Sequence, residues 1–185
     1  MMNETYKGYT IKIEQDVYFD LNPRTENDNA SKMVCFHGRY LLGDKHNLNS
    51  EMFDSWEEMK KHLMKKEDAC IIIPLYLYDH SGITMSTSPF SCRWDSGQVG
   101  YAYMSRKMIT ENYGGKYVTK KLKERAEKLI RGEVKEYDLY LTGQIYRYTI
   151  KDEDDNHIDS CSGYLTDDTD TILSECKSII DNIKK

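Results

Sequence analysis

Hydrophobic and polar residues alternate along several segments of the chain, and a period of two residues is typical of β-strands with one buried face. Residues 8–15 ("GYTIKIEQ") show this alternation, and residues 32–43 ("KMVCFHGRYLLG") predict a second strand. In residues 142–165 an alternating strand is followed by an acidic turn and another strand, which predicts a hairpin. We therefore expect a mainly antiparallel sheet.

A continuous apolar run at residues 69–78 ("ACIIIPLYLY") predicts a central strand that is buried on both faces. Pro74 lies inside this run, and because proline cannot donate a backbone hydrogen bond, it indicates a sheet edge or a bulge. Residues 97–105 ("GQVGYAYMS") predict the continuation of this strand after a segment rich in turn residues. Residues 20–31 contain several Asn and Asp residues and a proline, which predicts a loop.

Apolar residues at helical spacing predict three helices. Ser55 begins a capping box, and the helix after it is expected to run to about Lys66. Thr119 is suited to cap a second helix, which Gly132 would end. Residues 172–183 form a clear amphipathic pattern and predict a third helix.

Together these elements predict one α+β domain over residues 1–185, with a mainly antiparallel, twisted sheet and about three helices. Apolar residues make up 39% of the chain and charged residues 31%, as is typical of a globular protein. No apolar run approaches the roughly 20 residues that cross a bilayer, and the first residues lack the apolar stretch of a secretory signal. Five cysteines without a C-x-x-C pair fit reduced thiols. We therefore expect a cytoplasmic protein that has no membrane partner.

The formal net charge is −5, but basic residues concentrate in one segment. Residues 116–131 contain seven basic and two acidic residues. If any part of the chain touches nucleic acid, we expect it to be this basic helix, because clustered cations bind phosphates. A solvated helix face is the alternative. The basic residues are Lys116, Lys120, Lys121, Lys123, Arg125, Lys128 and Arg131.

Acidic residues concentrate in residues 151–170, with eight acidic residues against one basic residue. An acidic hairpin can compete for a protein groove that normally holds nucleic-acid phosphate, so its tip is a candidate binding site. Here too, a solvated surface is the alternative. The acidic tip consists of Asp152, Glu153, Asp154 and Asp155.

Several motifs of enzymes and metal sites are absent or incomplete. The chain has no G-x-S-x-G, G-x-x-x-x-G-K-[ST], H-E-x-x-H or G-x-G-x-x-G motif, so we expect neither catalysis nor a cofactor. Asp152, Asp154 and Asn156 have the spacing of the first three ligands of a calcium loop. His157 and Gly163 occupy the positions where that loop needs glycine and glutamate, so an acidic hairpin tip is the better interpretation.

A zinc site could be assembled from Cys35, His37, His80 and Cys92, since thiolates and imidazoles are zinc ligands. Cys35 and His37 are two residues apart on a predicted strand and would face the same side. Nothing in the sequence places the other two residues beside them. We therefore expect no metal site.

Asp79, His80, Cys92 and Asp95 form a candidate catalytic window. An acid, an imidazole and a thiol can form a nucleophilic relay, so a small hydrolase or nuclease is an alternative function. The same residue types also make good turns, because Asp and Ser side chains bond to nearby backbone amides. We favour the turn, because a catalytic relay is recognised by its geometry, and the spacing of residues in a sequence does not supply that geometry.

Two segments carry a resemblance to a known group of proteins. They are residues 22–46 ("NPRTENDNASKMVCFHGRYLLGDKH") and residues 74–105 ("PLYLYDHSGITMSTSPFSCRWDSGQVGYAYMS"). They resemble a mostly uncharacterised family of small proteins carried by phages and mobile elements of gut Firmicutes, and residues 131–150 resemble it more loosely. The first segment of that family is expected to be similar to N-P-R-E-W-D-N-L-G-T-M. This chain departs from it at residues 25–27 and 30–32.

The resemblance implies a biological role. Small acidic proteins on such elements frequently counter host defence, and some members look like inhibitors of the RNA-guided nuclease of type II CRISPR systems. We therefore expect a protein that inhibits a bacterial defence system by binding, in the cytoplasm of the bacterial host cell. The expected partner is a defence effector complex of protein and guide RNA, and the basic helix could add a nucleic-acid contact.

Overall fold

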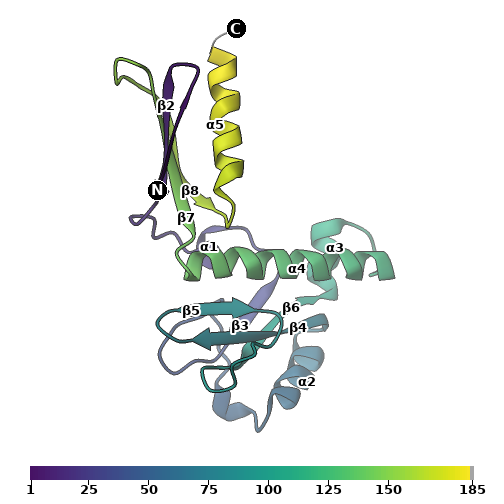
Figure 1. Ribbon diagram of the computed structural model, residues 1–185. Helices are drawn as coiled ribbons and strands as arrows, with labels where there is room; N and C mark the ends of the chain where they lie inside the picture. The colour runs from purple at the N-terminus through teal and green to yellow at the C-terminus, as the bar shows by residue number, and fades with distance from the viewer. Residues whose placement is uncertain (184–185) are drawn as a thin grey trace. The chain divides into compact units, whose positions relative to one another are not determined.

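The computed structural model describes residues 1–183, and its contacts cluster into two compact units (Figure 1). The terminal unit comprises Met1–Leu21 and the chain from Leu139 onward, and the central unit comprises Asn22–Asp138. Each unit contains its own antiparallel sheet, so the predicted α+β class is confirmed, although two sheets replace the single one expected. The assignment of residues 1–185 to one domain stays a prediction.

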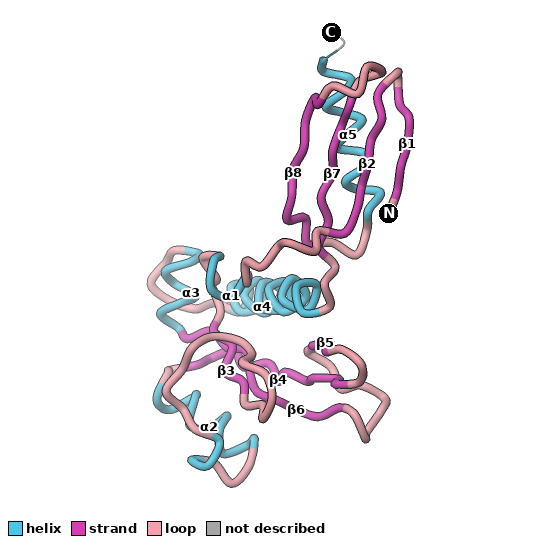
Figure 2. The backbone as a smooth tube through the Cα atoms, turned by 90° about the vertical axis from the view of Figure 1, so that its left-hand side faces the viewer, coloured by secondary structure: helices cyan, strands magenta, loops and turns pink. Residues whose placement is uncertain are grey.

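The terminal unit is a four-stranded sheet with one helix. Its strand order is β1-β2-β7-β8, and every neighbouring pair is antiparallel. Helix α5 runs along one face of this sheet (Figure 2). The predicted first strand, hairpin and last helix are thus confirmed. The elements are β1 (Met2–Tyr6), β2 (Tyr9–Gln15), β7 (Ile145–Lys151), β8 (His157–Leu165) and α5 (Thr169–Ile183).

The period-two pattern explains the core of the terminal unit. Alternate residues of β2 and β7 point toward α5 and form one buried cluster with it, which includes Ile11, Ile13, Ile150 and Ile180. Each fully buried isoleucine contributes about 1.5–3 kcal/mol relative to an exposed one. The polar residues between them line the other face of the sheet, which stays solvated.

The central unit has the strand order β3-β6-β4-β5, and all pairs are antiparallel. Its short edge strand β5 pairs only with Tyr76–Asp79 of β4. Among the described residues, Pro74 therefore has a strand neighbour on the β6 side alone, which fits the edge position that its missing N–H requires. The strands are β3 (Lys32–Cys35), β4 (Ala69–Asp79), β5 (Ile83–Ser86) and β6 (Ser96–Ser105).

Helices cover both faces of the central sheet, with α2 on one side and α4 on the other (Figures 1 and 2). On the α2 side, Met59 and Leu63 pack with residues of β3 and β6 in one buried cluster. The structure has five α-helices within residues 1–183, against about three predicted, because the short helices α1 and α3 were missed. The helices of this unit are α1 (Pro23–Glu26), α2 (Trp56–Lys66), α3 (Arg106–Tyr113) and α4 (Lys120–Leu141), with a 3₁₀ turn at Ser50–Met52.

Three details of the prediction were wrong. Helix α4 continues past Gly132, because Val134 and Tyr137 extend its buried side and outweigh the cost of about 1 kcal/mol for an internal glycine. The strand predicted for residues 32–43 ends at Cys35 and is followed by an irregular loop. Strand β4 alternates between well buried and half-buried positions instead of being fully buried on both faces.

Within the described chain, no helix is long and apolar enough to span a bilayer.

Candidate functional site

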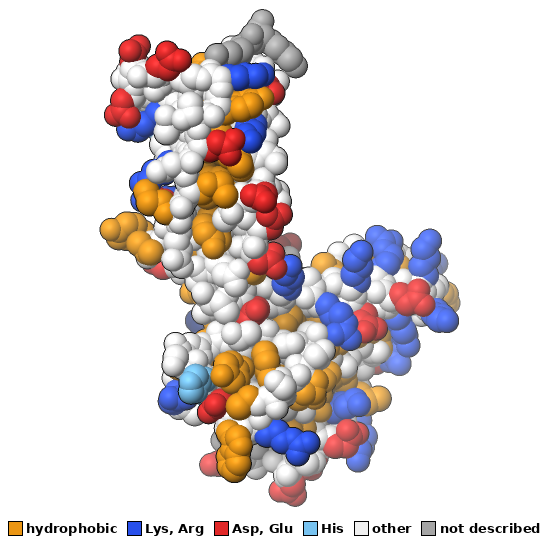
Figure 3. Space-filling view, viewed as in Figure 1, with side chains coloured by type: hydrophobic (Ala, Val, Ile, Leu, Met, Phe, Trp, Pro, Cys, Tyr) orange, Lys and Arg blue, Asp and Glu red, His pale blue; other side chains and the backbone are white. Residues whose placement is uncertain are grey.

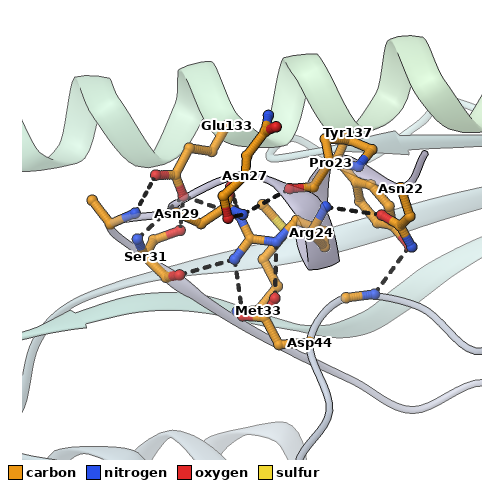
Figure 4. Close-up of polar contacts among 12 residues, drawn as sticks. Asn22, Pro23, Arg24, Asn27, Asn29, Ser31, Met33, Asp44, Glu133 and Tyr137 are labelled. Atoms are coloured by element: carbon orange, nitrogen blue, oxygen red, sulfur yellow. Dashed lines mark hydrogen bonds and ion pairs between the residues drawn. The ribbon is translucent and has the colours of Figure 1, made fainter.

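Arg24 is the centre of a buried polar network in the central unit (Figure 4). Only 1% of its side chain is exposed. Its Nε and Nη2 atoms donate to the two carboxylate oxygens of Asp44 at 3.0 and 2.9 Å, and its Nη1 atom donates to Glu133 at 3.1 Å. The same guanidinium donates to Asn29 Oδ1 and to the Ser31 carbonyl. Burial lowers the pKa of Arg24, but the hydrogen bonds and charges of Asp44 and Glu133 raise it above its ordinary value.

Glu133 connects helix α4 to the loop that follows α1. Its Oε1 atom accepts a hydrogen bond from the Ala30 amide at 2.8 Å, and its Oε2 atom accepts from both the amide and the hydroxyl of Ser31. The Arg24 network is built from segments that are far apart in sequence, since Arg24 and Glu133 are 109 residues apart. Because the guanidinium and its carboxylates are enclosed, the Asn22-Pro23-Arg24 sequence has a structural role here: it starts α1 and anchors a loop.

The candidate catalytic window comes together only in part. The Asp95 carboxylate lies 3.4 Å from Nδ1 of His80 and 3.5 Å from Sγ of Cys92. The acid is therefore between the imidazole and the thiol, whereas a nucleophilic relay needs the imidazole in the middle. The Asp79 carboxylate points elsewhere, toward Arg39 and toward Nε2 of His37 at 3.6 Å.

The backbone around this window forms a turn. The Asp79 amide donates to the Asp95 carbonyl at 2.8 Å, and the His80 amide donates to the Gly82 carbonyl at 3.0 Å. Ser81 has a positive φ of 57°, as is common in tight turns. The His80 side chain is 62% exposed, so its contact with Asp95 is largely solvated. The local structure supports the turn interpretation, and catalysis by these residues stays a hypothesis.

A surface hollow of about 490 Å³ lies beside this turn. Asp79 and Asp95 line it together with Arg39 and Trp94, and Trp94 is 96% exposed. One arginine lies among two carboxylates here, so these three side chains have a formal charge of −1.

The residues considered for zinc do not form one group. Cys35 is buried, and burial raises the pKa of its thiol to about 12. Since β3 ends at Cys35, the strand alternation does not extend to His37, which faces Asp79 instead. Within residues 1–183, no cluster of three or more His, Cys, Asp and Glu side chains is arranged to hold a metal ion.

The acidic tip lies at the β7–β8 turn, and its four carboxylates differ in their environment. Asp152 stabilises the turn: its oxygens accept hydrogen bonds from the Asn156 side chain and amide and from the Asp154 amide, and these bonds lower its pKa. Asp155 pairs with Lys151 at 2.8 Å. Glu153 and Asp154 are exposed at the tip. These two residues are therefore the ones best placed to meet a partner.

All seven basic residues predicted for binding are exposed in the central unit. Six of them lie on α4, and Lys116 lies in the loop before it. The Thr119 hydroxyl accepts a hydrogen bond from the Leu122 amide at 3.3 Å, as expected for a helix cap. Arg131 is partly neutralised, since it pairs with Glu127 at 2.8 Å.

The two units differ in charge. The terminal unit has seven Lys and Arg residues against fourteen Asp and Glu residues, a formal charge of −7. The central unit has nineteen against seventeen, a formal charge of +2, and the two values add up to the −5 of the chain. The acidic and basic segments seen in the sequence thus belong to different units.

Comparison of the chain with protein-family models, with curated proteins and with solved structures found no match in any of the three. The geometry itself identifies residues that the sequence analysis missed, above all Arg24, Asp44 and Glu133. The Asn22-Pro23 pair was the available indication of α1, because Asn is a good helix cap and Pro suits the first helical position.

Proposed function

We propose that this protein acts by binding, as a phage or mobile-element inhibitor of a bacterial defence system in the host cytoplasm. The foremost candidate target is the RNA-guided DNA nuclease of type II CRISPR systems, a complex of protein and guide RNA. The observation that carries the proposal is the charge of −7 on the terminal unit, together with the resemblance of two segments to mobile-element proteins.

The acidic terminal unit offers a physical basis for such inhibition. A groove that holds guide RNA or target DNA is lined by Lys and Arg, and a carboxylate-rich surface can compete with phosphates for it. Glu153 and Asp154 are exposed at one end of this unit. Val17 and Tyr18 are 72% and 82% exposed in the loop after β2, and a tyrosine of this kind is a frequent anchor in protein interfaces.

The direct experiment is a DNA-cleavage assay with a purified type II effector, its guide and increasing amounts of the protein. We expect cleavage to fall as the protein approaches saturation. The double variant Glu153→Gln/Asp154→Asn should weaken inhibition by about tenfold at low salt and less at high salt, because exposed charges act mainly through screened long-range attraction.

A matched control is Asp28→Asn/Glu57→Gln, which removes two exposed negative charges from the central unit and should leave inhibition unchanged. Full cleavage in the presence of saturating wild-type protein would exclude this nuclease as the target. Capture of another defence complex from a host lysate would then identify the target, and capture of no defence complex would exclude the broader role.

A small hydrolase or nuclease is the alternative, and one observation favours it: Asp95 holds the His80 imidazole and the Cys92 thiol within 3.5 Å of one carboxylate. If this window is catalytic, the purified protein should cleave a nucleic-acid or ester substrate, and Cys92→Ala and His80→Ala should each abolish that activity. Activity that persists in both variants would rule out the window.

A further inference from the structure

The turn between α3 and α4 and the first half of α4 present a concentrated positive surface in the central unit. Lys and Arg side chains gather over the start of α4 (Figure 3). We call this surface the basic face, and it consists of Lys116, Lys120, Lys121, Arg125 and Lys128 with the tyrosines Tyr113 and Tyr117. All five cations are exposed.

Helical spacing divides the cations of α4 into two rows. Lys121, Arg125 and Lys128 follow one another at intervals of four and three residues, so they line one side of the helix, and Glu124 lies at its border, three residues after Lys121 and four before Lys128. The adjacent row contains Glu124 and Glu127, and Glu127 pairs with Arg131 of the same row. With three exposed cations and one carboxylate at its border, the first row keeps a net positive charge.

Two tyrosines accompany these cations. The Tyr117 side chain is 81% exposed and follows Lys116 directly in the loop before α4. Tyr113 at the end of α3 is half-buried, with the Arg125 guanidinium 4.6 Å from the centre of its ring. An exposed aromatic ring among cations is suited to stack on a nucleobase while the cations contact phosphates.

We propose that the basic face binds single-stranded nucleic acid. The row Lys121, Arg125 and Lys128 contacts successive phosphates, and Tyr117 stacks on an unpaired base. A single strand fits better than a duplex, because the bases of a duplex are already stacked on one another and leave no flat face for Tyr117. This binding is a property of the isolated protein and does not depend on the proposed inhibition.

The test is fluorescence anisotropy with labelled single-stranded DNA, single-stranded RNA and duplex DNA of one sequence, between 50 and 200 mM salt. We expect the single strands to bind more tightly than the duplex. With three or four phosphates contacted, the logarithm of the affinity should fall with the logarithm of the salt concentration with a slope of about −2 to −3. Comparing the affinities for single-stranded DNA and single-stranded RNA shows whether the sugar contributes to binding.

Two variants test the residues. Lys116→Glu/Lys121→Glu/Lys128→Glu should reduce the affinity for single strands at least about tenfold and flatten the salt dependence. Tyr117→Ala should reduce it by about tenfold, since stacking on one base has this size. The control Lys45→Glu/Lys61→Glu/Lys65→Glu makes the same change of charge at three exposed lysines elsewhere in the central unit.

The control should keep its affinity, and thermal melting should show that all variants are folded. Full affinity of the triple basic-face variant, or an equal loss in the control, would overturn the proposal. Equal binding of duplex and single strand with no effect of Tyr117→Ala would overturn the assignment to single strands. Retention of heparin or an acidic protein without any nucleic-acid binding would assign the basic face to another partner.

Discussion

The substitution Arg24→Ala tests whether the buried network is a main source of stability in the central unit. It removes two hydrogen bonds to Asp44 and one each to Glu133, Asn29 and the Ser31 carbonyl. Two nearly enclosed carboxylates then lose their cation. Breaking a buried ion pair from one side costs about 3–5 kcal/mol, because the remaining charge stays desolvated. This is a large part of the roughly 5–15 kcal/mol that stabilises a typical domain.

The assay is urea unfolding followed by circular dichroism. With a slope of about 2 kcal/mol per molar urea, the midpoint should fall by roughly 1.5–2.5 M. Arg24→Lys should recover only part of this loss, since an ammonium cannot make the two parallel bonds to Asp44. The matched control is Arg39→Ala, which breaks the ion pair of an arginine that is 68% exposed and should cost about 0–1 kcal/mol. If Arg24→Ala costs no more than Arg39→Ala, the network is not a main source of stability.

Three further predictions concern two glycines and one thiol. Gly132→Ala should raise the free energy of unfolding by about 0.5–1 kcal/mol in urea, because the added Cβ meets nothing within 4 Å inside a helix. Gly43→Ala should lower it by more than about 1 kcal/mol, because φ is +70° and the Cβ would lie 2.6 Å from the Met33 carbonyl oxygen. An unfolded thiol ionises near pH 8.5, whereas burial raises the pKa of Cys35 to about 12. The Cys35 thiol therefore contributes fully to the free energy of unfolding below about pH 8.5, and this contribution is lost as the pH rises toward 12. In urea titrations between about pH 8 and 10.5, Cys35→Ala should lose less stability than the wild type.

The elements that local patterns determine were predictable from the sequence. The alternation in β2 and β7 and the stripe in α5 each need one buried face, so their type and orientation follow from the sequence. The division into two units was not predictable. Helix α4 continues through the boundary at Asp138 and Leu139 without a glycine, a proline or a change in composition. The pairing of β3 with β6 joins distant residues, and no local pattern specifies it.

The candidate sites were predictable where they depend on exposure alone. The cations of α4 are exposed because the apolar stripe is buried, which the spacing of Ala126 and Ile130 already indicates. The positions of the window residues were not predictable. The sequence places Asp79 and His80 side by side, but the β4–β5 turn sends His80 toward Asp95 and leaves Asp79 with Arg39.

Glu133 shows how the sequence could have indicated the buried network. It lies three residues after the buried Ile130 and four before the buried Tyr137, so helical spacing places its carboxylate on the buried side of α4. A buried carboxylate needs a cation and hydrogen-bond donors, which Arg24 supplies from α1 and Ser31 from the loop after it. The opposite side of the same helix carries Lys121 and its row. Because the two sets of residues occupy different sides, charge changes on the basic face leave the Arg24 network intact, and a loss of binding in those variants can be assigned to the surface itself.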